Sequence, residues 1–341
     1  MTRAMATIRT VLEIKTIRAA DKVEAVRVGG WWVVCKKGEF SVGQSVVYFE
    51  IDSWIPETLA PFLFKGKEYQ GIPGARLRTI RLRKQLSQGL IMSLEACAIV
   101  RGTLAGLDFS AENTLDMWLG ILKWEPPFNE FHCRGEAKGI FPPNWRKTDQ
   151  ERCQNILDEI EEHYGADTVF EVTIKLDGSS MSVGTSLEGE YTVASRNVNL
   201  KIEENPDNTF IQVARESVAQ ECLPLGMQIS GELVGVGIQG NREKIRGHDF
   251  FVYDVFNVAE GTYLSAASRL TICAELGLRH VPVLHAEVTL RELGLRTVDD
   301  LLEFAEGASL NAEVREGVVF KAIDGSFSFK AIANSYLLKE K

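Results

Sequence analysis

Residues 173–179 have the sequence Thr173-Ile174-Lys175-Leu176-Asp177-Gly178-Ser179, directly after the apolar run Val169-Phe170-Glu171-Val172. The apolar run predicts a β-strand that ends near Lys175, and Gly178 permits a turn. A lysine whose ammonium loses water can act as a nucleophile, because burial favours its neutral form. The motif Lys-x-Asp-Gly is equally typical of an ordinary strand end with a solvated lysine. The rest of the chain has to separate these two interpretations.

The composition is typical of a globular chain long enough for two domains. Its 341 residues are 45% hydrophobic and 25% charged. A run of about 18 apolar residues would be needed to span a membrane, and none occurs, so we expect no membrane contact. Residues 1–6 lack the apolar region of a secretory signal, and the six cysteines are scattered without zinc-site spacing. We therefore expect a reduced, cytoplasmic protein.

Charge is distributed unevenly along the chain, whose net charge is −9. Residues 1–105 contain 16 Lys and Arg against 9 Asp and Glu, a net charge of +7. The remainder contains 22 against 38, a net charge of −16. This asymmetry indicates a basic N-terminal module followed by an acidic body. An acidic body can still handle phosphates, because carboxylates recruit the divalent metals that phosphate chemistry uses.

The N-terminal region consists of short β-branched and aromatic runs separated by turn signals. The predicted strands are Thr10–Arg18, Lys22–Val28, Trp31–Cys35 and Ser45–Ile51. Many short strands at this spacing favour a small barrel or sandwich.

A basic segment follows these strands in residues 75–84. Basic and apolar residues alternate there in two registers, which would place Arg76 with Arg78, and Arg81 with Arg83, on polar strand faces. Such a face on a small barrel is typical of an oligonucleotide-binding (OB) domain, so we predict nucleic-acid contacts from all four arginines. The alternative is a solvated edge strand whose charges prevent aggregation.

Proline pairs interrupt the region that follows, and they indicate a connector between two domains. We predict an OB-like domain at 1–105, a connector at 106–147 and a second domain at 148–341. Thr148 and Glu151 have capping-box spacing, which predicts a helix that starts near Asp149. Arg152 would then lie in the first helical turn, where it could bind an anion or pair with a neighbouring carboxylate in solvent.

Strands dominate the second domain, with helices between them. The predicted strands are Met181–Thr185, Tyr191–Ala194, Gln228–Val234, Phe250–Phe256, Arg315–Lys321 and Phe327–Ile332, and the predicted helices are Thr209–Glu221, Ser265–Leu276 and Val298–Ala305. The run Gly235–Gly240 matches Gly-x-Gly-x-x-Gly, but no helix opens at these glycines. We therefore reject a dinucleotide site there.

Several charged residues lie at strand positions in this domain. Glu232 and Glu316 precede apolar strand residues, Asp177 follows the lysine, and Lys330 lies near the end of a strand. Each alone is more often a surface charge. Together they supply a nucleophile, carboxylates for a metal and a cation for phosphates, which suits nucleotidyl transfer.

The order of these segments resembles the covalent nucleotidyltransferase superfamily of polynucleotide ligases and capping enzymes. The matching motifs are Lys175-Leu176-Asp177-Gly178, Ser195-Arg196-Asn197, Ser230-Gly231-Glu232-Leu233, Phe251-Val252-Tyr253-Asp254, Glu316-Gly317-Val318-Val319-Phe320-Lys321 and Phe329-Lys330-Ala331-Ile332. The OB-like module ahead of the transferase body, with residues 147–152 between, resembles ATP-dependent RNA ligases of the Deinococcus/Naegleria type. That family implies an α+β fold, with a ligase-type nucleotidyltransferase domain of antiparallel sheets and flanking helices after a small OB-like β-barrel.

The resemblance implies that 3′-OH and 5′-phosphate RNA ends are joined through lysyl-AMP on Lys175 and an adenylylated 5′ end. The implied cofactors are ATP and Mg²⁺ or Mn²⁺, with the metal held through water by Asp177, Glu232 and Glu316. The implied ATP-binding residues are Thr173, Ile174, Lys175, Arg152, Arg196, Glu232, Tyr253 and Lys330, with Tyr253 or Phe251 stacked on adenine. Arg196 would also contact the RNA end. We expect a monomer that acts on RNA or an RNA-containing duplex with a nick.

One residue departs from the family pattern, which often has two lysines separated by one residue in its last motif. Lys330 is flanked at that spacing by Ser328 and Ile332, so the second phosphate contact would come from elsewhere, for example Lys321 or Lys339.

The alternative enzymatic functions are those of a DNA ligase or an RNA capping guanylyltransferase, whose OB domain usually follows the transferase domain. A nucleic-acid-binding protein with an inactive transferase body is the non-enzymatic alternative.

Overall fold

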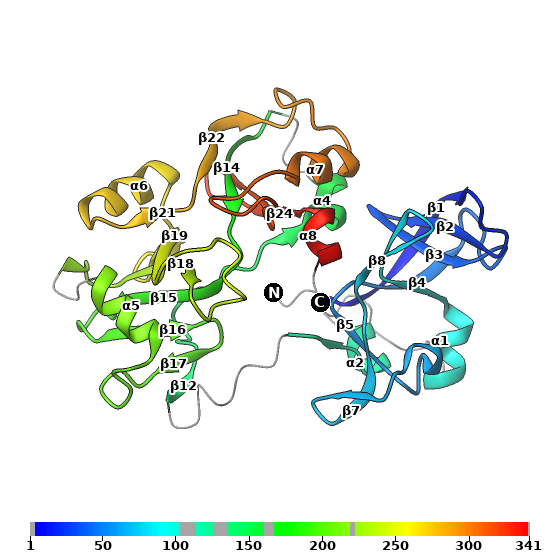
Figure 1. The fold of residues 1–341 in the computed structure, drawn as a ribbon, viewed down its shortest axis with the longest axis horizontal. Helices are drawn as coiled ribbons and strands as arrows, with labels where there is room; N and C mark the ends of the chain where they lie inside the picture. Colours follow the sequence, from blue (N-terminus) through cyan, green and yellow to red (C-terminus); the bar gives the residue numbers. More distant parts are fainter. Residues whose placement is uncertain (1–3, 103–113, 126–135, 160–166, 219–221, 340–341) are drawn as a thin grey trace. The chain divides into compact units, whose positions relative to one another are not determined.

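The computed structural model describes residues 4–102, 114–125, 136–159, 167–218 and 222–339 (Figure 1). The chain divides into two compact units, Met1–Phe128 with Leu337–Lys341 and Asn129–Tyr336. Within the described ranges, no helix is long and apolar enough to cross a membrane. Residues 106–113 and 126–135 of the predicted connector lie outside the described residues, and the predicted domain boundaries stay a prediction.

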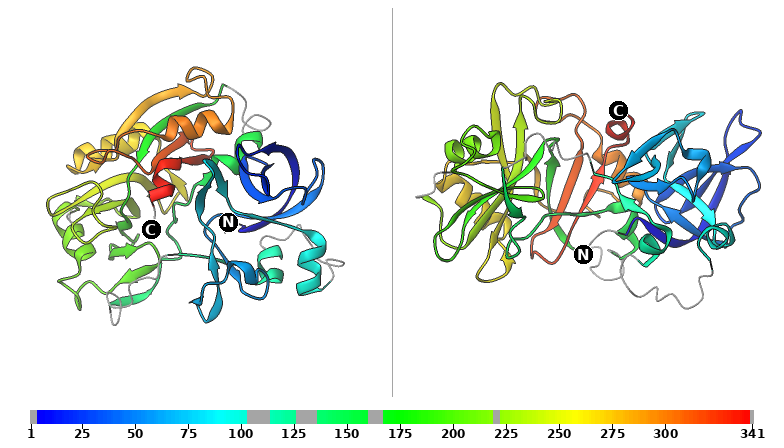
Figure 2. Two further views of the ribbon diagram at one scale, coloured as in Figure 1. Left: turned by 45° about the vertical axis from the view of Figure 1, so that its right-hand side comes forward. Right: turned by 90° about the horizontal axis from the view of Figure 1, so that it is seen from below.

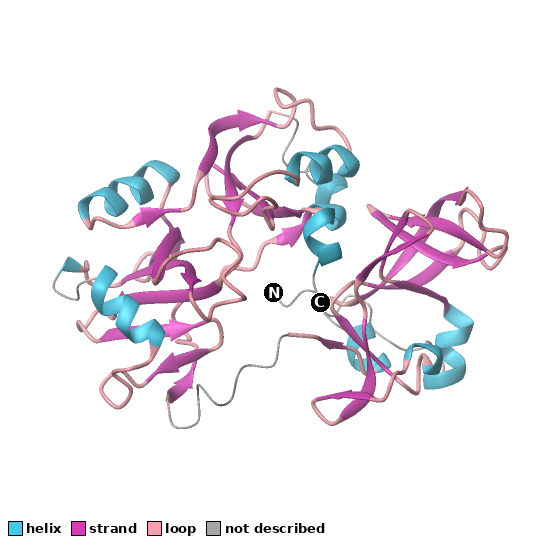
Figure 3. Cartoon of the chain, viewed as in Figure 1, coloured by secondary structure: helices cyan, strands magenta, loops and turns pink. Residues whose placement is uncertain are grey.

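The first unit is built mainly from antiparallel strands (Figure 3). One sheet has the order β10-β4-β1-β2-β3 and another β11-β5-β7-β6, and β8 pairs with β9. The strands are β1 (Ala6–Thr16), β2 (Val23–Val28), β3 (Trp31–Lys36), β4 (Ser45–Phe49), β5 (Ser53–Pro56), β6 (Lys67–Tyr69), β7 (Ile72–Arg76), β8 (Thr79–Leu82), β9 (Gln85–Gln88), β10 (Leu90–Ser93) and β11 (Leu122–Lys123). The four strands predicted at the N-terminus are confirmed, with ends shifted by a few residues.

Short helices cover the core of this unit. They are the 3₁₀ helix η1 (Pro61–Leu63), α1 (Leu94–Arg101) and α2 (Thr114–Leu119). The core includes Val47, Phe49 and Leu119, all fully buried. Asp116 of α2 accepts hydrogen bonds from the main-chain nitrogens at the start of β1, which anchors that strand to the helix.

The second unit contains two sheets (Figure 2). The first has the order β12-β17-β16-β15-β18-β19-β20, with β21 also paired to β19. Its strands are β12 (Ala137–Ile140), β15 (Ser179–Thr185), β16 (Tyr191–Ser195), β17 (Val198–Leu200), β18 (Met227–Gly235), β19 (His248–Asn257), β20 (Thr262–Tyr263) and β21 (Arg279–His280). Helices α5 (Thr209–Ser217) and α6 (Ala266–Glu275) contribute Ile211 and Cys273 to the same hydrophobic core as Val183 and Val252 of this sheet.

The other sheet has the order β13-β24-β23-β14-β22. Its strands are β13 (Glu151–Arg152), β14 (Val169–Lys175), β22 (Val283–Thr289), β23 (Gly317–Ala322) and β24 (Ser328–Ile332). Helices α4 (Cys153–Glu159) and α7 (Val298–Ala305) pack against it around Phe170, Phe320 and Phe329. The rings of Phe320 and Phe329 are stacked, with centroids 4.7 Å apart. A further helix, α8, spans Asn334–Lys339.

The strands and helices predicted for this region are confirmed within a few residues at their ends, except that residues 219–221 of the predicted helix Thr209–Glu221 lie outside the described residues. Strand β22 was not predicted. Its residues are mostly half-buried or exposed, so they lack the continuous apolar pattern that marks a central strand.

Candidate active site

Lys175 is the last residue of β14, the strand between β22 and β23. Side-chain alternation along β14 places Glu171, Thr173 and Lys175 on one face. Lys175 lies opposite Gly317 in the register with β23, so its ammonium reaches Glu316, the residue before that strand. The distance from Lys175 Nζ to Glu316 Oε2 is 2.7 Å. The strand end predicted from sequence is confirmed, and the lysine there is paired with a carboxylate.

The chain crosses from one sheet to the other immediately after Lys175. Residues 176–178 connect β14 of one sheet to β15 of the other. A Cβ atom on Gly178 would lie 2.4 Å from the carbonyl oxygen of Leu233, so only glycine fits here. The close approach sets the register that pairs Ser180 with Glu232. Gly178 therefore brings the Glu232 strand beside the lysine.

Asp177 is held by two groups that were not predicted. Its Oδ2 forms an ion pair with Arg242 Nε, 3.1 Å away, and its carboxylate also hydrogen-bonds with Tyr336. Burial and then Glu316 raise the pKa of Asp177 to about 6, against the opposing effects of Tyr336, Arg242 and Lys175.

The three predicted metal-binding carboxylates and Lys175 influence one another electrostatically. Burial raises the pKa of Glu232 to about 8, Lys175 opposes this, and Glu316 and Asp177 add to it. Burial alone would lower the pKa of Lys175, but Glu316, Glu232 and Asp177 outweigh it and raise that pKa. Lys175 is therefore an ammonium while these carboxylates face it alone. A cation bound to the carboxylates would remove this stabilisation.

The donor set fits a hydrated divalent cation, because carboxylates crowded enough to raise one another's pKa gain from added positive charge. Among the described residues, no group of three or more His, Cys, Asp or Glu side chains is placed to hold a metal ion directly. The prediction for Asp177, Glu232 and Glu316 is of contacts through water.

Two predicted phosphate-binding cations, Lys330 and Arg196, lie beside Asp149, and a third, Arg152, is on the strand next to Lys330. Lys330 Nζ is 3.3 Å from Asp149 Oδ1, and Arg196 Nη2 is 3.9 Å from Asp149 Oδ2. Arg152 in β13 pairs in parallel with Lys330 in β24. The structure therefore brings together residues from three separate motifs.

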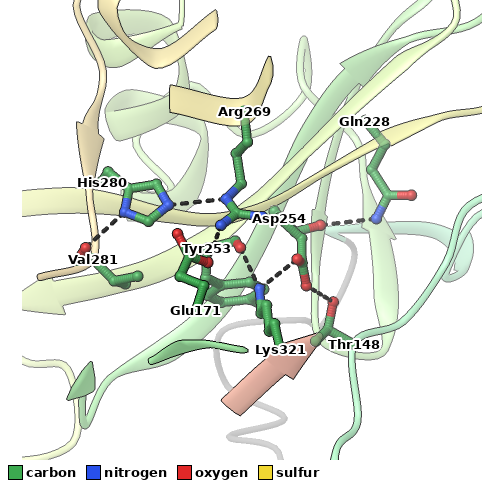
Figure 4. Close-up of polar contacts among 10 residues, drawn as sticks. Thr148, Glu171, Gln228, Tyr253, Asp254, Arg269, His280, Val281 and Lys321 are labelled. Carbon is green, nitrogen blue, oxygen red and sulfur yellow. Dashed lines mark hydrogen bonds and ion pairs between the residues drawn. The ribbon is translucent and has the colours of Figure 1, made fainter. Parts of the chain in front are cut away.

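The helix predicted to start near Asp149 is wrong at its N-terminus. The helix α4 begins at Cys153, and Arg152 belongs to strand β13. Thr148 is not a helix cap, because its hydroxyl donates to Asp254 Oδ2 at 2.9 Å (Figure 4). The Glu151 carboxylate accepts from its neighbour's main-chain nitrogen and from Asn155. Long-range pairing has thus overridden the local capping signal.

The remaining ATP-site predictions lie on strands β14 and β19. Thr173 and Ile174 are buried, at 2% and 7% exposure. Tyr253 is half-buried and its hydroxyl hydrogen-bonds with Ser180 Oγ at 2.7 Å. Phe251 is 4% exposed within a hydrophobic cluster that includes Ile174, which leaves Tyr253 as the candidate for adenine.

Lys321, considered as a replacement for the second lysine beside Lys330, is committed elsewhere. Its ammonium pairs with the Asp254 carboxylate and donates to the main-chain carbonyl of Tyr253 (Figure 4). Glu171 pairs with Arg269 in the same region, and Arg269 Nε donates to His280 Nε2 at 2.9 Å. These buried charges join the two sheets beside the site.

The basic segment of the first unit differs from the prediction. Arg76 is not solvent-facing, because its guanidinium pairs with Asp52 at 2.5 Å and lies 3.7 Å from the centroid of the Trp124 ring. Arg78, Arg81 and Arg83 are exposed. Arg81 lies on β8, but Arg83 lies in the turn after it, with φ of 48°. The predicted shared face of Arg81 and Arg83 is therefore wrong, since the turn ends the alternation.

Two family models match the chain in the expected order. A model described as an OB-fold domain matches residues 5–94, and one described as RNA ligase matches residues 168–332. A Naegleria gruberi RNA ligase, solved as an apo aspartate-to-alanine variant, is 41% identical to this chain, with a TM-score of 0.88 over 99% of this chain and 98% of that one. The chain belongs to the RNA ligase family.

Further structures agree with this assignment, although no match was found among curated protein sequences. The Naegleria gruberi RNA ligase with PPi is 41% identical, with a TM-score of 0.88 over 99% of each chain. A lysine-to-alanine variant of it with ATP and Mn is 40% identical, with a TM-score of 0.87 over 98% of this chain and 99% of that one. The predicted α+β fold, with an OB module ahead of a ligase body, and the predicted ATP-dependent RNA ligase are confirmed.

Sequence reasoning missed several side chains of this RNA ligase that contact the predicted site residues. They are Arg242, Tyr336 and Asp149. Arg242 lies just beyond the glycine-rich run that was rejected as a dinucleotide site. The sequence holds no local signal for these contacts, because each partner lies far away along the chain.

Proposed function

We propose that this RNA ligase joins 3′-OH and 5′-phosphate ends at nicks in RNA-containing duplexes, with ATP and Mg²⁺ or Mn²⁺. The observation that carries the proposal is the position of Lys175 at a strand end, beside carboxylates from three different segments. The relatives solved with ATP and Mn and with PPi support ATP as the nucleotide and a divalent metal as its companion.

The reaction has three steps. Neutral Lys175 Nζ attacks the α-phosphorus of ATP, forming an N–P bond as the bond to pyrophosphate breaks. An oxygen of the RNA 5′-phosphate then attacks the same phosphorus, and Lys175 leaves. Finally the 3′-OH attacks the activated 5′-phosphate, and AMP departs as the strand is sealed.

Asp177, Glu232 and Glu316 would hold the hydrated metal through water. When bound, the metal supplies positive charge that stabilises the negative phosphoryl oxygens. These carboxylates raise the pKa of Lys175 when they face it alone. Engaging them with a cation would free its ammonium to lose a proton.

The cations around Asp149 would bind the phosphates of the nucleotide. Lys330 and Arg152 lie side by side on paired strands, so both can face one phosphate chain. Arg196, from another sheet, would contact either the nucleotide or the RNA end. Tyr253 would stack on adenine, and Thr173 and Ile174 would shape the wall beside Lys175.

The first unit would bind RNA through Arg78, Arg81 and Arg83, which are exposed. Arg76 is better assigned a structural role, given its pairing with Asp52. Replacing Arg81 and Arg83 with glutamine should weaken RNA binding and lower its salt dependence, whereas Arg18→Gln, at another exposed position, should not. Unchanged RNA binding would mean that the β8–β9 hairpin, which carries both arginines, does not contact RNA. The proposed enzyme acts as a cytoplasmic monomer.

Incubation with α-labelled ATP and Mn²⁺ tests the first step. Covalent label should appear on the wild type and be absent from Lys175→Ala. Lys36→Ala is a matched control, because Lys36 also ends a strand but is exposed. Label from GTP alone would indicate capping, and complete absence of label would indicate a binding protein.

Sealing assays test the substrate. A nicked duplex with RNA on the 3′-OH side should be sealed, and the same nick with DNA on that side should be sealed less well. Equal sealing of both would support a general polynucleotide ligase, and preference for the DNA strand would indicate a DNA ligase.

A further inference from the structure

Arg242 comes from the loop between β18 and β19, which begins with the glycine-rich run set aside above. Its Nε forms an ion pair with Asp177 Oδ2, 3.1 Å away. Its guanidinium carbon also lies 4.5 Å from the ring centroid of Tyr336, whose hydroxyl hydrogen-bonds with the same carboxylate. Arg242 and Tyr336 therefore contact each other and Asp177, so the three side chains restrain one another.

The loop is anchored on the residue next to Arg242. Glu243 is 2% exposed, and its carboxylate accepts hydrogen bonds from the Ser309 hydroxyl and from the main-chain nitrogen of Asn311 at 2.9 Å. Ser309 and Asn311 belong to the segment that leads to Glu316 in the sequence. The same anchor therefore ties the loop that carries Arg242 to the segment before another site carboxylate.

The loop backbone is held in an uncommon conformation. Asn241 has φ of 47° and Lys244 has φ of 53°, a region that side-chain-bearing residues rarely adopt. The Asn241 amide exchanges two hydrogen bonds with the main chain of Ile245, each 3.0 Å. Such a conformation persists only where surrounding contacts fix it, and it is common at functional sites.

We propose that Arg242 and Tyr336 are positioning residues that orient Asp177 toward the divalent metal of the adenylylation step. The inference rests on the proposed function. A metal-binding carboxylate usually depends on hydrogen bonds from neighbouring groups, which set its orientation, and loss of such a partner weakens metal binding. Tyr336 hydrogen-bonds with the Asp177 carboxylate, and Arg242 pairs with it through its guanidinium.

Mn²⁺ binding to the free protein, followed by electron paramagnetic resonance titration, tests the inference without relying on activity. Arg242→Gln should weaken Mn²⁺ binding by about 10-fold, with partial recovery in Arg242→Lys and a smaller loss in Tyr336→Phe. Arg246→Gln is the control, since Arg246 is exposed in the same loop. The Mn²⁺ concentration for half-maximal lysyl-AMP formation should shift in parallel.

Unchanged Mn²⁺ affinity in Arg242→Gln overturns the inference, and tighter binding would mean that Arg242 competes with the metal. If Arg242→Gln fails to fold, unchanged affinity in both Arg242→Lys and Tyr336→Phe has the same meaning. Failure of the proposed function looks different, because the wild type would then form no lysyl-AMP whatever the Mn²⁺ affinities of the variants.

Discussion

Two clusters of charged residues lie between the same two sheets, and they differ in charge balance. In the buried cluster, Glu171 pairs with Arg269 and Asp254 pairs with Lys321 (Figure 4). In the active-site cluster, the three carboxylates of Asp177, Glu232 and Glu316 are crowded together, with Lys175 paired to Glu316 and Arg242 paired to Asp177.

The difference separates structural charges from functional ones. In a buried ion pair, the attraction between the two charges offsets the cost of removing them from water. Such pairs can join the sheets without a bound ligand. Burial raises the pKa values of Glu232 and Asp177, and the neighbouring carboxylates raise them further. Added positive charge would relieve this crowding, which is why we propose these carboxylates as the metal site.

The largest expected effect comes from breaking the balanced cluster. Arg269→Ala leaves Glu171 buried without its ion pair, because the two side chains are 4% and 2% exposed. The free energy of unfolding should fall by about 3–5 kcal/mol, measured by urea denaturation. Arg279→Ala is the control, since that arginine is 62% exposed. An equal, small loss in both variants would contradict the structural role of the cluster.

Removing one charge from the active-site cluster should lower activity and leave stability unchanged. Glu232→Gln relieves repulsion among the carboxylates, so stability should be kept, while the rate of lysyl-AMP formation falls by about 100-fold. Label transfer and urea denaturation, measured on the same preparation, check both parts. A variant that is strongly destabilised would show that Glu232 belongs with the structural charges.

Acid should weaken the balanced cluster through His280. His280 Nε2 accepts a hydrogen bond from Arg269 Nε, and His280 Nδ1 lies against the Val281 carbonyl oxygen. A proton on Nε2 would therefore place an imidazolium cation against the Arg269 guanidinium. Burial and Arg269 lower the pKa of His280 below its ordinary 6.5. The unfolded chain therefore gains a proton first as pH falls, and the full stability holds only above about pH 6.5.

Free energies of unfolding measured at pH 7.5 and pH 5.5 test whether stability falls as the pH is lowered. Wild type should lose about 1 kcal/mol more than His280→Asn over that interval, within the limit of about 1.4 kcal/mol per pKa unit. An identical pH dependence in the two proteins would mean that His280 does not couple to folding.

The smallest expected effect is at Asp149, which lies between Lys330 and Arg196 at 3.3 and 3.9 Å. Asp149→Asn removes a negative charge where phosphates would bind, so ATP should bind about 3-fold more tightly, as expected for a charge at a partly exposed site. Equilibrium ATP binding, with Asp167→Asn as an exposed control, measures the change. Weaker ATP binding would instead make Asp149 a support for the two cations.

Most of the central strands, the order of the motifs and the family could be predicted from the sequence. Local periodicity shows in an apolar strand such as β14 or β19, and the Lys-x-Asp-Gly motif correctly placed Lys175, the proposed nucleophile, at a strand end. The half-exposed strand β22 and the start of α4 escaped prediction. In both cases contacts distant in sequence outweighed the local pattern.

Which charges pair became visible in the folded chain alone. It turned Arg76 from a predicted RNA contact into the partner of Asp52, and it committed Lys321 to Asp254. It also brought Arg242 to Asp177 across 65 positions of sequence. The physical reason is that an ion pair forms between side chains close in space, and a sequence shows the charge of a residue without its partner.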